Sequence, residues 1–383
     1  MKTGAREAVI AHGGGPTAVL NSSLAGLVKG CAANSFDSLF AARFGLTGVL
    51  DPQLFDLLTL PESKIAAIAA SPGSVIGSSR KKLNEPDFEQ ILDVLRERDI
   101  RVVFYTGGNG SMQTAFDLLR HAGDARFELQ VIGIPKTIDN DLMVTHHTPG
   151  YASTAYFFAC AARDAGTDCR SLPSPVCVLE TLGRNAGWIV AATALARKEP
   201  DDPPHLIYLP ERRISLERIA ADVEKVYRRL GYVVVTVCEG QLDEKGLPFG
   251  AEVDRPGSAV HQLASNLGHT LARRITEATG LRARAEKPGL IGRSCGPFAR
   301  PRDRVEAFTC GFAAAEAARA GHNGVMIALD QDGGTFLTGL QQVARQERLL
   351  PSGWISPEGN DVTEEFIRYA SPLAGEVEAY PQL

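Results

Sequence analysis

Glycines, carboxylates and a lysine gather in three short segments of this sequence, each of which follows an apolar run. The first two segments are Gly13-Gly14-Gly15 and Gly107-Gly108-Asn109-Gly110-Ser111, and apolar residues at helical spacing follow both of them. A strand, a glycine turn and a helix start together present backbone N–H groups and the positive end of a helix dipole to an anion. We therefore expect both turns to bind phosphate, although either turn alone could be a purely structural connection from strand to helix.

The third segment, Pro135-Lys136-Thr137-Ile138-Asp139-Asn140-Asp141, contains two carboxylates, a hydroxyl and an ammonium. It follows the apolar run at 131–134, just as the second glycine segment follows the run at 102–105. Loops that leave the carboxyl ends of strands in an open α/β sheet meet in one crevice. These side chains should therefore face the glycine turns and supply the groups that phosphoryl transfer requires. An Asx turn that caps a helix is the structural alternative for the two aspartates.

The elements that must position these segments are indicated by the spacing of apolar residues. Apolar runs predict strands at 7–12, 102–105, 131–134, 176–179, 206–209, 232–238 and 324–329. Helical spacing predicts helices at 88–98, from 111 onwards, at 151–165 and at 310–320, and the passage at 42–77 is interpreted as loop-rich. The alternation predicts an α/β fold with Rossmann-like parallel sheets and flanking helices. A chain of 383 residues predicts two lobes that share a cleft.

Composition narrows the class of protein. The sequence is 44% hydrophobic and 22% charged, as in an ordinary globular enzyme, and its net charge of -5 argues against nucleic acid as a partner. Its seven cysteines are scattered without a CxxC motif, which indicates reduced thiols in the cytosol. A signal peptide and a run of about 18 apolar residues are both lacking. We expect a cytoplasmic protein that does not insert into a membrane.

The second glycine segment and the acidic segment resemble the phosphofructokinase family. The glycine segment is more distantly similar to the loops of NAD kinases and diacylglycerol kinases, but the TIDND sequence belongs to phosphofructokinases. The first segment, GGGPTAVLN, looks like the first loop of the pyrophosphate-type branch. The resemblance spans roughly 7–330. It implies a phosphoryl-donor lobe at 1–150 plus about 297–345 and a sugar-phosphate lobe at 151–296. The segment 346–383 would pack on either lobe.

The resemblance also implies roles for the acidic segment. Asp139 would accept the proton of the sugar's 1-hydroxyl, and Thr137 would hydrogen-bond the incoming sugar phosphate. Asp141 and Asn109 would bind Mg2+, which prefers a few protein oxygens together with water and substrate phosphates. The commoner family residue at Asn109 is an aspartate, so metal binding should be weaker here. Arg80 would reach the transferring phosphate, for which a guanidinium fork is suited, with a solvated surface cation as the alternative.

The resemblance continues in later motifs of the sequence, and these imply a sugar-phosphate site. Its candidate residues are Leu182, Gly183, Arg184, Glu239, Arg284 and Arg293. Glu239 would accept sugar hydroxyls, while Arg284 and Arg293 would grip the 6-phosphate, one of them often from a neighbouring subunit. A homodimer or homotetramer is therefore expected. Pro175 and Leu290 stand where bacterial ATP-dependent enzymes carry an arginine and a histidine. The acceptor could accordingly be another ketose phosphate, such as sedoheptulose 7-phosphate.

Two residues indicate opposite phosphoryl donors. Lys136 is typical of the pyrophosphate-type branch, where an ammonium can hold the leaving phosphate. Gly110 stands where pyrophosphate users carry an aspartate that repels the α-phosphate of ATP, so it favours ATP. The implied function is a glycolytic 6-phosphofructokinase with Mg2+ as cofactor, fructose 6-phosphate as acceptor and ATP as the preferred donor. The alternatives are a pyrophosphate-dependent enzyme, a non-catalytic regulatory subunit and a NAD-kinase-like enzyme.

Overall fold

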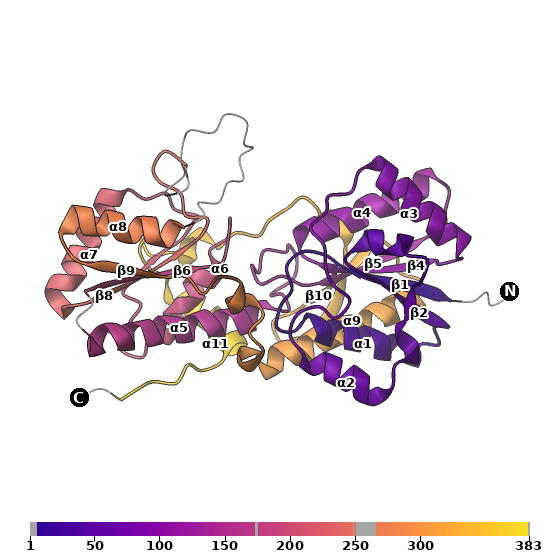
Figure 1. The fold of residues 1–383 in the computed structure, drawn as a ribbon, viewed down its shortest axis with the longest axis horizontal. Helices are drawn as coiled ribbons and strands as arrows, with labels where there is room; N and C mark the ends of the chain where they lie inside the picture. The colour runs from indigo at the N-terminus through magenta and orange to yellow at the C-terminus, as the bar shows by residue number, and fades with distance from the viewer. Residues whose placement is uncertain (1–5, 173–174, 248, 250–265, 382–383) are drawn as a thin grey trace. The chain divides into compact units, whose positions relative to one another are not determined.

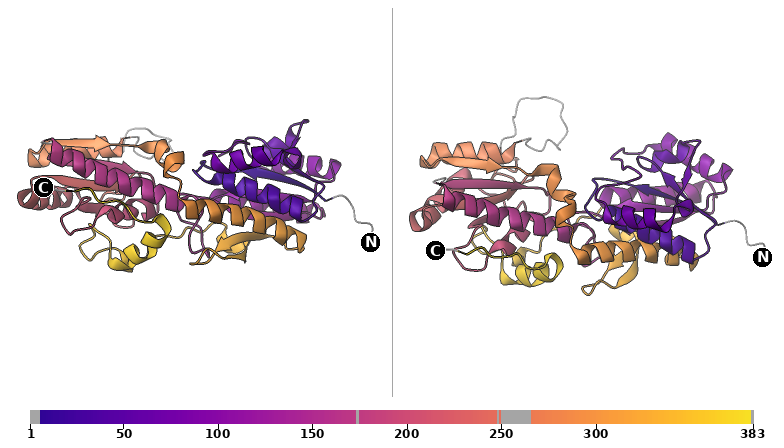
Figure 2. Two further views of the ribbon diagram at one scale, coloured as in Figure 1. Left: turned by 90° about the horizontal axis from the view of Figure 1, so that it is seen from below. Right: turned by 60° about the horizontal axis from the view of Figure 1, so that its bottom comes forward.

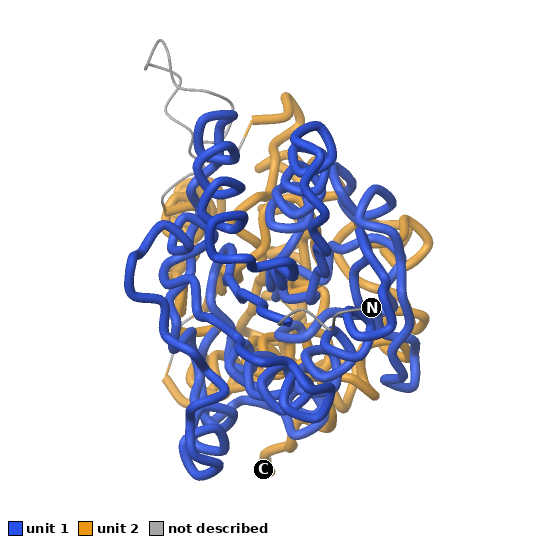
Figure 3. The backbone as a smooth tube through the Cα atoms, turned by 90° about the vertical axis from the view of Figure 1, so that its right-hand side faces the viewer, with its two compact units in different colours: residues 1–151, 294–348 blue, residues 152–293, 349–383 orange. Residues whose placement is uncertain are grey.

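The computed structural model describes residues 6–172, 175–247, 249 and 266–381, which divide into two compact units. Unit 1 comprises Met1–Tyr151 and Ser294–Arg348, and unit 2 comprises Ala152–Arg293 and Leu349–Leu383. Figure 3 shows the two units in blue and orange. The chain thus enters each unit twice. The functional assignment of donor and sugar-phosphate lobes stays a prediction.

Unit 1 contains a seven-stranded sheet with the strand order β11-β10-β5-β4-β1-β2-β3. The strands are β1 (Glu7–His12), β2 (Ser38–Ala42), β3 (Phe55–Asp56), β4 (Val102–Gly107), β5 (Gln130–Pro135), β10 (Val325–Leu329) and β11 (Thr335–Gly339). The two edge strands, β3 and β11, are antiparallel to their neighbours, and the five inner strands are parallel. The direction of the strand order reverses between β1 and β4, a topological switch point of the kind at which α/β sheets bind ligands.

Helices cover both faces of this sheet (Figures 1 and 2). They are α1 (Leu20–Ala33), α2 (Glu62–Ala70), α3 (Glu85–Glu97), α4 (Asn109–Asp124), α9 (Pro301–Arg319) and α10 (Leu340–Val343). Alternate residues of β1 serve the two faces: Ile10 packs in the cluster that contains α1 and α9, and Val9 packs in the cluster that contains α3 and α4. This double coverage explains why the inner strands of the sheet are mostly apolar.

Unit 2 contains a four-stranded parallel sheet with the order β7-β8-β6-β9. Its strands are β6 (Val176–Thr181), β7 (Leu206–Tyr208), β8 (Val233–Cys238) and β9 (Ala283–Glu286), and its helices are α5 (Tyr151–Ser171), α6 (Trp188–Ala192), α7 (Leu216–Leu230), α8 (Leu267–Thr279) and α11 (Glu364–Ala374). Val178 packs in the cluster of α7 and α8, whereas Leu179 and Cys177 pack against α5 on the opposite face.

The predicted α/β fold with parallel sheets and flanking helices is confirmed. The interpretation of the passage at 42–77 as loop-rich was wrong in part, because it contains α2. Pro61 precedes this helix, and Ile65 and Ile68 bury one side of it. The short strands β2, β3, β9 and β11 were not predicted. Among the described residues, no helix is long and apolar enough to cross a membrane.

Candidate active site

The two glycine turns of unit 1 lie side by side because β1 and β4 are neighbours in the sheet. His12 pairs with Thr106 at the ends of these strands, and the Gly13 N–H donates to the Thr106 carbonyl at 2.8 Å. A Cβ on Gly13 would lie 2.1 Å from the Ser111 hydroxyl oxygen, and one on Gly107 would lie 2.0 Å from it. Both turns therefore need glycine in order to close around Ser111.

The Lys136 ammonium is buried beside the first turn. It donates to the carbonyls of Gly13 and Gly15, both at 2.7 Å, and only 3% of the lysine is exposed. Gly14 has a φ of +79°, and a Cβ there would lie 3.1 Å from the ammonium nitrogen. The first glycine turn thus adopts a conformation that only glycine favours, directly beside a positive charge.

Arg80 lies next to the same turn along the chain. The residue before it, Ser79, forms a parallel bridge with Gly13, and its carbonyl accepts the Gly14 N–H at 2.8 Å. Arg80 itself is exposed. The structure therefore brings a second cation into the neighbourhood of the first glycine turn without burying it.

The second turn opens directly into α4. Gly108 is the N-cap, and Asn109, Gly110 and Ser111 form the first turn of the helix. Gly110 is exposed, and a Cβ at this position would have no atom within 4 Å. The N-terminus of α4 therefore has open space at Gly110, the residue that favours ATP as the donor.

The buried Asp141 and the half-buried Asn109 form a polar pair. The Asn109 amide nitrogen donates to Oδ2 of Asp141 at 2.8 Å and to its carbonyl at 3.2 Å. Asp141 Oδ1 and Asn109 Oδ1 are both buried without a hydrogen-bond partner among the described residues. Burial, followed by the charges of Asp139 and Glu347, raises the pKa of Asp141 to about 7.

These features fit a divalent cation. Two buried oxygens without donors, in a place where negative charge is crowded, are the ligands that Mg2+ prefers. No group of three or more His, Cys, Asp and Glu side chains in the described part of the chain forms a complete metal site. Asp141 and Asn109 could therefore hold Mg2+ with water and substrate phosphate as the other ligands.

Asp139 and Thr137 form a short turn beside this pair. The Asp139 N–H donates to the Thr137 hydroxyl oxygen at 3.0 Å. Thr137 is buried, and Asp139 is half-buried. The whole acidic segment thus lies in unit 1 together with both glycine turns, as the sequence predicted for parallel strands.

In unit 2, the loops that follow β6 and β8 touch each other. The Gly240 N–H donates to the Gly183 carbonyl at 3.2 Å, and a Cβ on Gly240 would lie 1.5 Å from the Arg184 carbonyl. Leu182 and Gly183 are buried, Arg184 is exposed, and Glu239 is half-buried. The carboxyl edge of this sheet therefore brings a guanidinium and a carboxylate into neighbouring loops.

The two predicted 6-phosphate arginines lie in different elements of unit 2: Arg284 is in β9, and Arg293 ends the short helix Gly289–Arg293 that follows it. Arg284 pairs with Cys177, five residues before Leu182, which corresponds to about 16 Å along a strand. Arg293 follows Gly292, whose Cα packs close to the Phe158 ring of α5. Cys177 packs on Cys169 and Leu179 packs on Ala162, so α5 runs antiparallel to β6, and the earlier residue Phe158 lies toward the carboxyl edge. Within one chain, Arg293 thus lies toward the carboxyl edge, from which the loop of Arg184 leaves, whereas Arg284 lies nearer the amino end of β6.

A half-buried carboxylate that no sequence pattern indicates, that of Glu211, supports this edge. Glu211 Oε1 accepts the N–H groups of Gly187 at 2.8 Å and Leu350 at 2.9 Å. Burial raises the pKa of Glu211. Gly187 ends the segment that carries Arg184, so Glu211 fixes the backbone of that segment. A lone glutamate after a short strand carries no sequence signal for this role.

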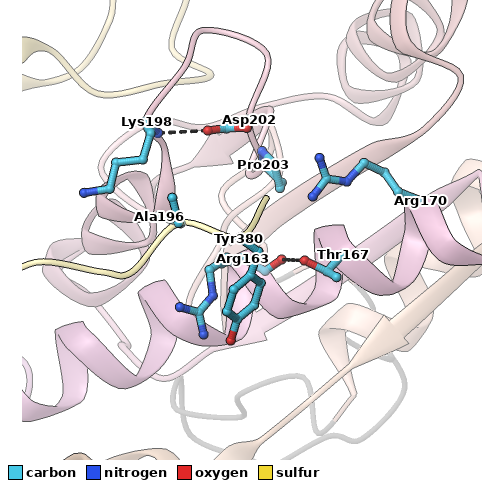
Figure 4. A pocket seen from close by; sticks show the side chains of 9 residues that line it. Arg163, Thr167, Arg170, Ala196, Lys198, Asp202, Pro203 and Tyr380 are labelled. Carbon is cyan, nitrogen blue, oxygen red and sulfur yellow. Dashed lines mark hydrogen bonds between the residues drawn. The ribbon is translucent and has the colours of Figure 1, made fainter. Parts of the chain in front are cut away.

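A small pocket elsewhere in unit 2 has a volume of about 30 Å³ (Figure 4). Its lining residues are Arg163, Thr167, Arg170, Ala196, Lys198, Asp202, Pro203, Ala379 and Tyr380. The Arg163 guanidinium lies 4.0 Å from the centre of the Tyr380 ring. None of the predicted site residues lines this pocket.

Comparisons with known proteins agree over nearly the whole chain. The family model described as Phosphofructokinase matches residues 7–318. The chain is 36% identical over 379 residues to pyrophosphate–fructose 6-phosphate 1-phosphotransferase of Rhodospirillum rubrum, covering 96% of this chain and 94% of that protein. It is 34% identical over 377 residues to the protein of the same name from Xanthomonas campestris pv. campestris, with coverage of 95% and 90%.

A solved structure is similar over the same extent. The crystal structure of pyrophosphate-dependent phosphofructokinase from Marinobacter aquaeolei superposes with a TM-score of 0.87 and 30% identity. The match covers 99% of this chain and 93% of that one.

Proposed function

The chain belongs to the phosphofructokinase family, as its motifs predicted, and we propose that it transfers a phosphoryl group from pyrophosphate to the 1-hydroxyl of fructose 6-phosphate. The observation that carries the choice of donor is the Lys136 ammonium, buried against the first glycine turn. A compact dianionic leaving group gains most from such a charge. The names of the relatives also favour pyrophosphate as the donor, whereas Gly110 favours ATP.

The groups of unit 1 account for the chemical step. Asp139 accepts the proton of the sugar's 1-hydroxyl. The hydroxyl oxygen forms a bond to phosphorus while the bond from phosphorus to the leaving phosphate breaks. Lys136, Arg80 and the N–H groups of the glycine turns bind the phosphates of the donor, and Thr137 hydrogen-bonds the incoming sugar phosphate. Mg2+, held by Asp141 and Asn109, would neutralise charge on the phosphates when bound.

The groups of unit 2 account for recognition of the acceptor. Arg184 and Arg293 bind the sugar phosphate, and Glu239 accepts its hydroxyls. Arg284 pairs with Cys177 near the amino end of β6, away from the end where the loop of Arg184 begins, so we assign it to the site of a second copy in a homodimer or homotetramer. This assignment makes the assembled oligomer the active form.

Phosphorus-31 NMR tests this function directly. With pyrophosphate, fructose 6-phosphate and Mg2+, the protein should produce orthophosphate and a second phosphate ester on C1, at equal rates. A protein that forms no sugar bisphosphate from pyrophosphate under these conditions would contradict the proposal.

ATP is the second candidate donor because a specific observation favours it. The space around Gly110 is open at the N-terminus of α4, so no side chain there excludes an α-phosphate. The same NMR assay with ATP should then show ADP and the sugar bisphosphate, and the ratio of the two rates would measure how far this open space offsets the contribution of Lys136.

A further inference from the structure

Arg348, which belongs to none of the sequence motifs, binds the backbone of the acidic segment and of the residues that follow it. Its Nε and Nη2 donate to the Asn140 carbonyl at 3.1 and 2.8 Å. Its Nη1 donates to the carbonyls of Thr145 at 2.7 Å and His146 at 2.6 Å. Its backbone N–H donates to the Asp141 carbonyl at 2.8 Å. One residue therefore holds four carbonyls of a single loop.

This loop has little regular structure of its own. Residues 136–150, all of which are described, contain no helix or strand, and one bridge joins Thr137 to Gly150. Asn140 has a φ of +54° and is fully buried, and Val144 has a φ of +70°. A left-handed conformation at such residues persists only where the surroundings hold it, and buried carbonyls need donors. At Asn140, Arg348 donates hydrogen bonds to the carbonyl and thereby also helps to hold the left-handed conformation.

A second anchor holds the other end of the loop. His147 Nε2 lies 2.8 Å from Glu306 Oε2, and the Gly150 N–H donates to Asp303 Oδ1 at 2.8 Å. Both carboxylates belong to α9. The anchors from α9 therefore fix the part of the loop after His146, whereas Arg348 binds carbonyls between Asn140 and His146, directly after Asp139 and including that of Asp141.

We propose that Arg348 is a positioning residue: it fixes the backbone on either side of Asn140 and thereby sets the spacing of Asp139 and Asp141. The planar guanidinium suits this task, because its N–H groups diverge toward several carbonyls at fixed angles, which a lysine ammonium cannot reproduce. The inference rests on the proposed function, in which Asp139 is the base and Asp141 is a ligand of Mg2+.

Arg304 provides a matched control. Its guanidinium also donates to carbonyls within unit 1, those of Ala69, Ala70 and Gly296, and none of these lies in the loop. Arg348→Ala should lower kcat about tenfold or more and raise the Mg2+ concentration for half-maximal rate by a similar factor. The KM for fructose 6-phosphate should stay within about twofold, and Arg304→Ala should leave all three values within about twofold.

Rescue separates positioning from general damage to the fold. Guanidinium ion added to Arg348→Ala should restore part of kcat, with no such gain for Arg304→Ala. The kcat of Arg348→Lys should remain well below that of wild type, because a single ammonium replaces the planar guanidinium. If Arg348→Ala does not fold, Arg348→Lys takes its place in every comparison.

Two measurements remain decisive even if the protein proves inactive with either donor. Hydrogen exchange in peptides spanning 139–148 should be faster in Arg348→Ala than in wild type, and Mn2+ binding, followed by electron paramagnetic resonance, should weaken about tenfold. Arg304→Ala should match wild type in both. The inference would be overturned if Arg348→Ala matched Arg304→Ala in loop exchange and in Mn2+ affinity.

Discussion

At the scale of single residues, unit 1 sets a buried cation and a buried pair of unpaired oxygens in neighbouring loops. The Lys136 ammonium lies against Gly13 and Gly15, while Oδ1 of Asp141 and Oδ1 of Asn109 have no donor among the described residues. Buried oxygens without a donor are costly unless a ligand completes them. We infer that a divalent cation is the partner of Oδ1 of Asp141 and Oδ1 of Asn109.

Asp139 carries the sharpest prediction at this scale. Asp139→Ser should lower kcat by about 10³-fold, because general-base catalysis contributes roughly 10² to 10⁴. The dissociation constant of fructose 6-phosphate, measured by calorimetry, should change by less than about twofold, since Arg184, Glu239 and Arg293 supply the main contacts to the sugar phosphate and are unchanged. Asp139→Asn serves as the isosteric control and should be equally inactive. Near-normal turnover in either variant would show that Asp139 is not the base.

Gly110 tests the electrostatic argument about the donor. Gly110→Asp should raise the inhibition constant or KM of ATP at least about tenfold, while the rate with pyrophosphate stays within about threefold. Gly110→Asn is the matched control, because it fills the same open space without a charge. Equal ATP constants in the two variants would mean that size, and not charge, excludes the nucleotide.

At the scale of elements, strand ends explain which parts of the site could be predicted. The glycine turns and the acidic segment follow apolar strands, so their meeting at one sheet edge followed from parallel topology. Arg348 could not be predicted, because its partner Asn140 is 208 residues away in the sequence and no motif marks a guanidinium that binds carbonyls. Arg284 was assigned to the 6-phosphate from a motif alone, whereas its position along β6 depends on the register between β9 and β6.

The contact between the loops after β6 and β8 yields the prediction at this scale. Gly240→Ala should raise the KM for fructose 6-phosphate about tenfold or more, because the new Cβ would lie 1.5 Å from the Arg184 carbonyl and must displace that loop. Gly353→Ala is the control within unit 2, since a Cβ there meets nothing within 4 Å. An unchanged KM in Gly240→Ala would show that the position of the Arg184 loop does not govern acceptor binding.

At the scale of the whole molecule, two largely parallel sheets were predictable from apolar runs, but the short strands β2, β3, β9 and β11 were not. The short strands β3 and β9 carry too few apolar residues at a regular period, so their pairing depends on neighbours distant in the sequence. The assignment of Arg284 to a second copy belongs to this scale, because it concerns the oligomer.

Mixing two inactive variants tests that assignment. Oligomers formed from Arg284→Ala and Asp139→Ser subunits should regain activity, because the Arg284→Ala subunit keeps Asp139 and receives Arg284 from its neighbour. Rates measured after refolding the variants together and separately would reveal the gain. No recovery in verified mixed oligomers would place Arg284 in the site of its own chain, or in no site at all.

Stability should fall as the pH drops below about 6.5, the usual pKa of histidine. Burial, followed by the charge of Lys136, lowers the pKa of His12 to about 3. The unfolded chain therefore binds a proton that the folded chain excludes, at a cost of up to about 1.4 kcal/mol for each pH unit below 6.5. Urea midpoints at pH 7.5 and 5.5 measure this loss, and His12→Asn should reduce it. An identical loss in His12→Asn would exclude His12 as its source.

The initial velocity of fructose 6-phosphate phosphorylation, measured with Mg2+ and either pyrophosphate or ATP, tests the central claim most directly. The buried Lys136 and the similarity to pyrophosphate-dependent enzymes predict a high rate with pyrophosphate and a rate at least about tenfold lower with ATP. A high rate with ATP and none with pyrophosphate would contradict the account and assign the choice of donor to the open space at Gly110.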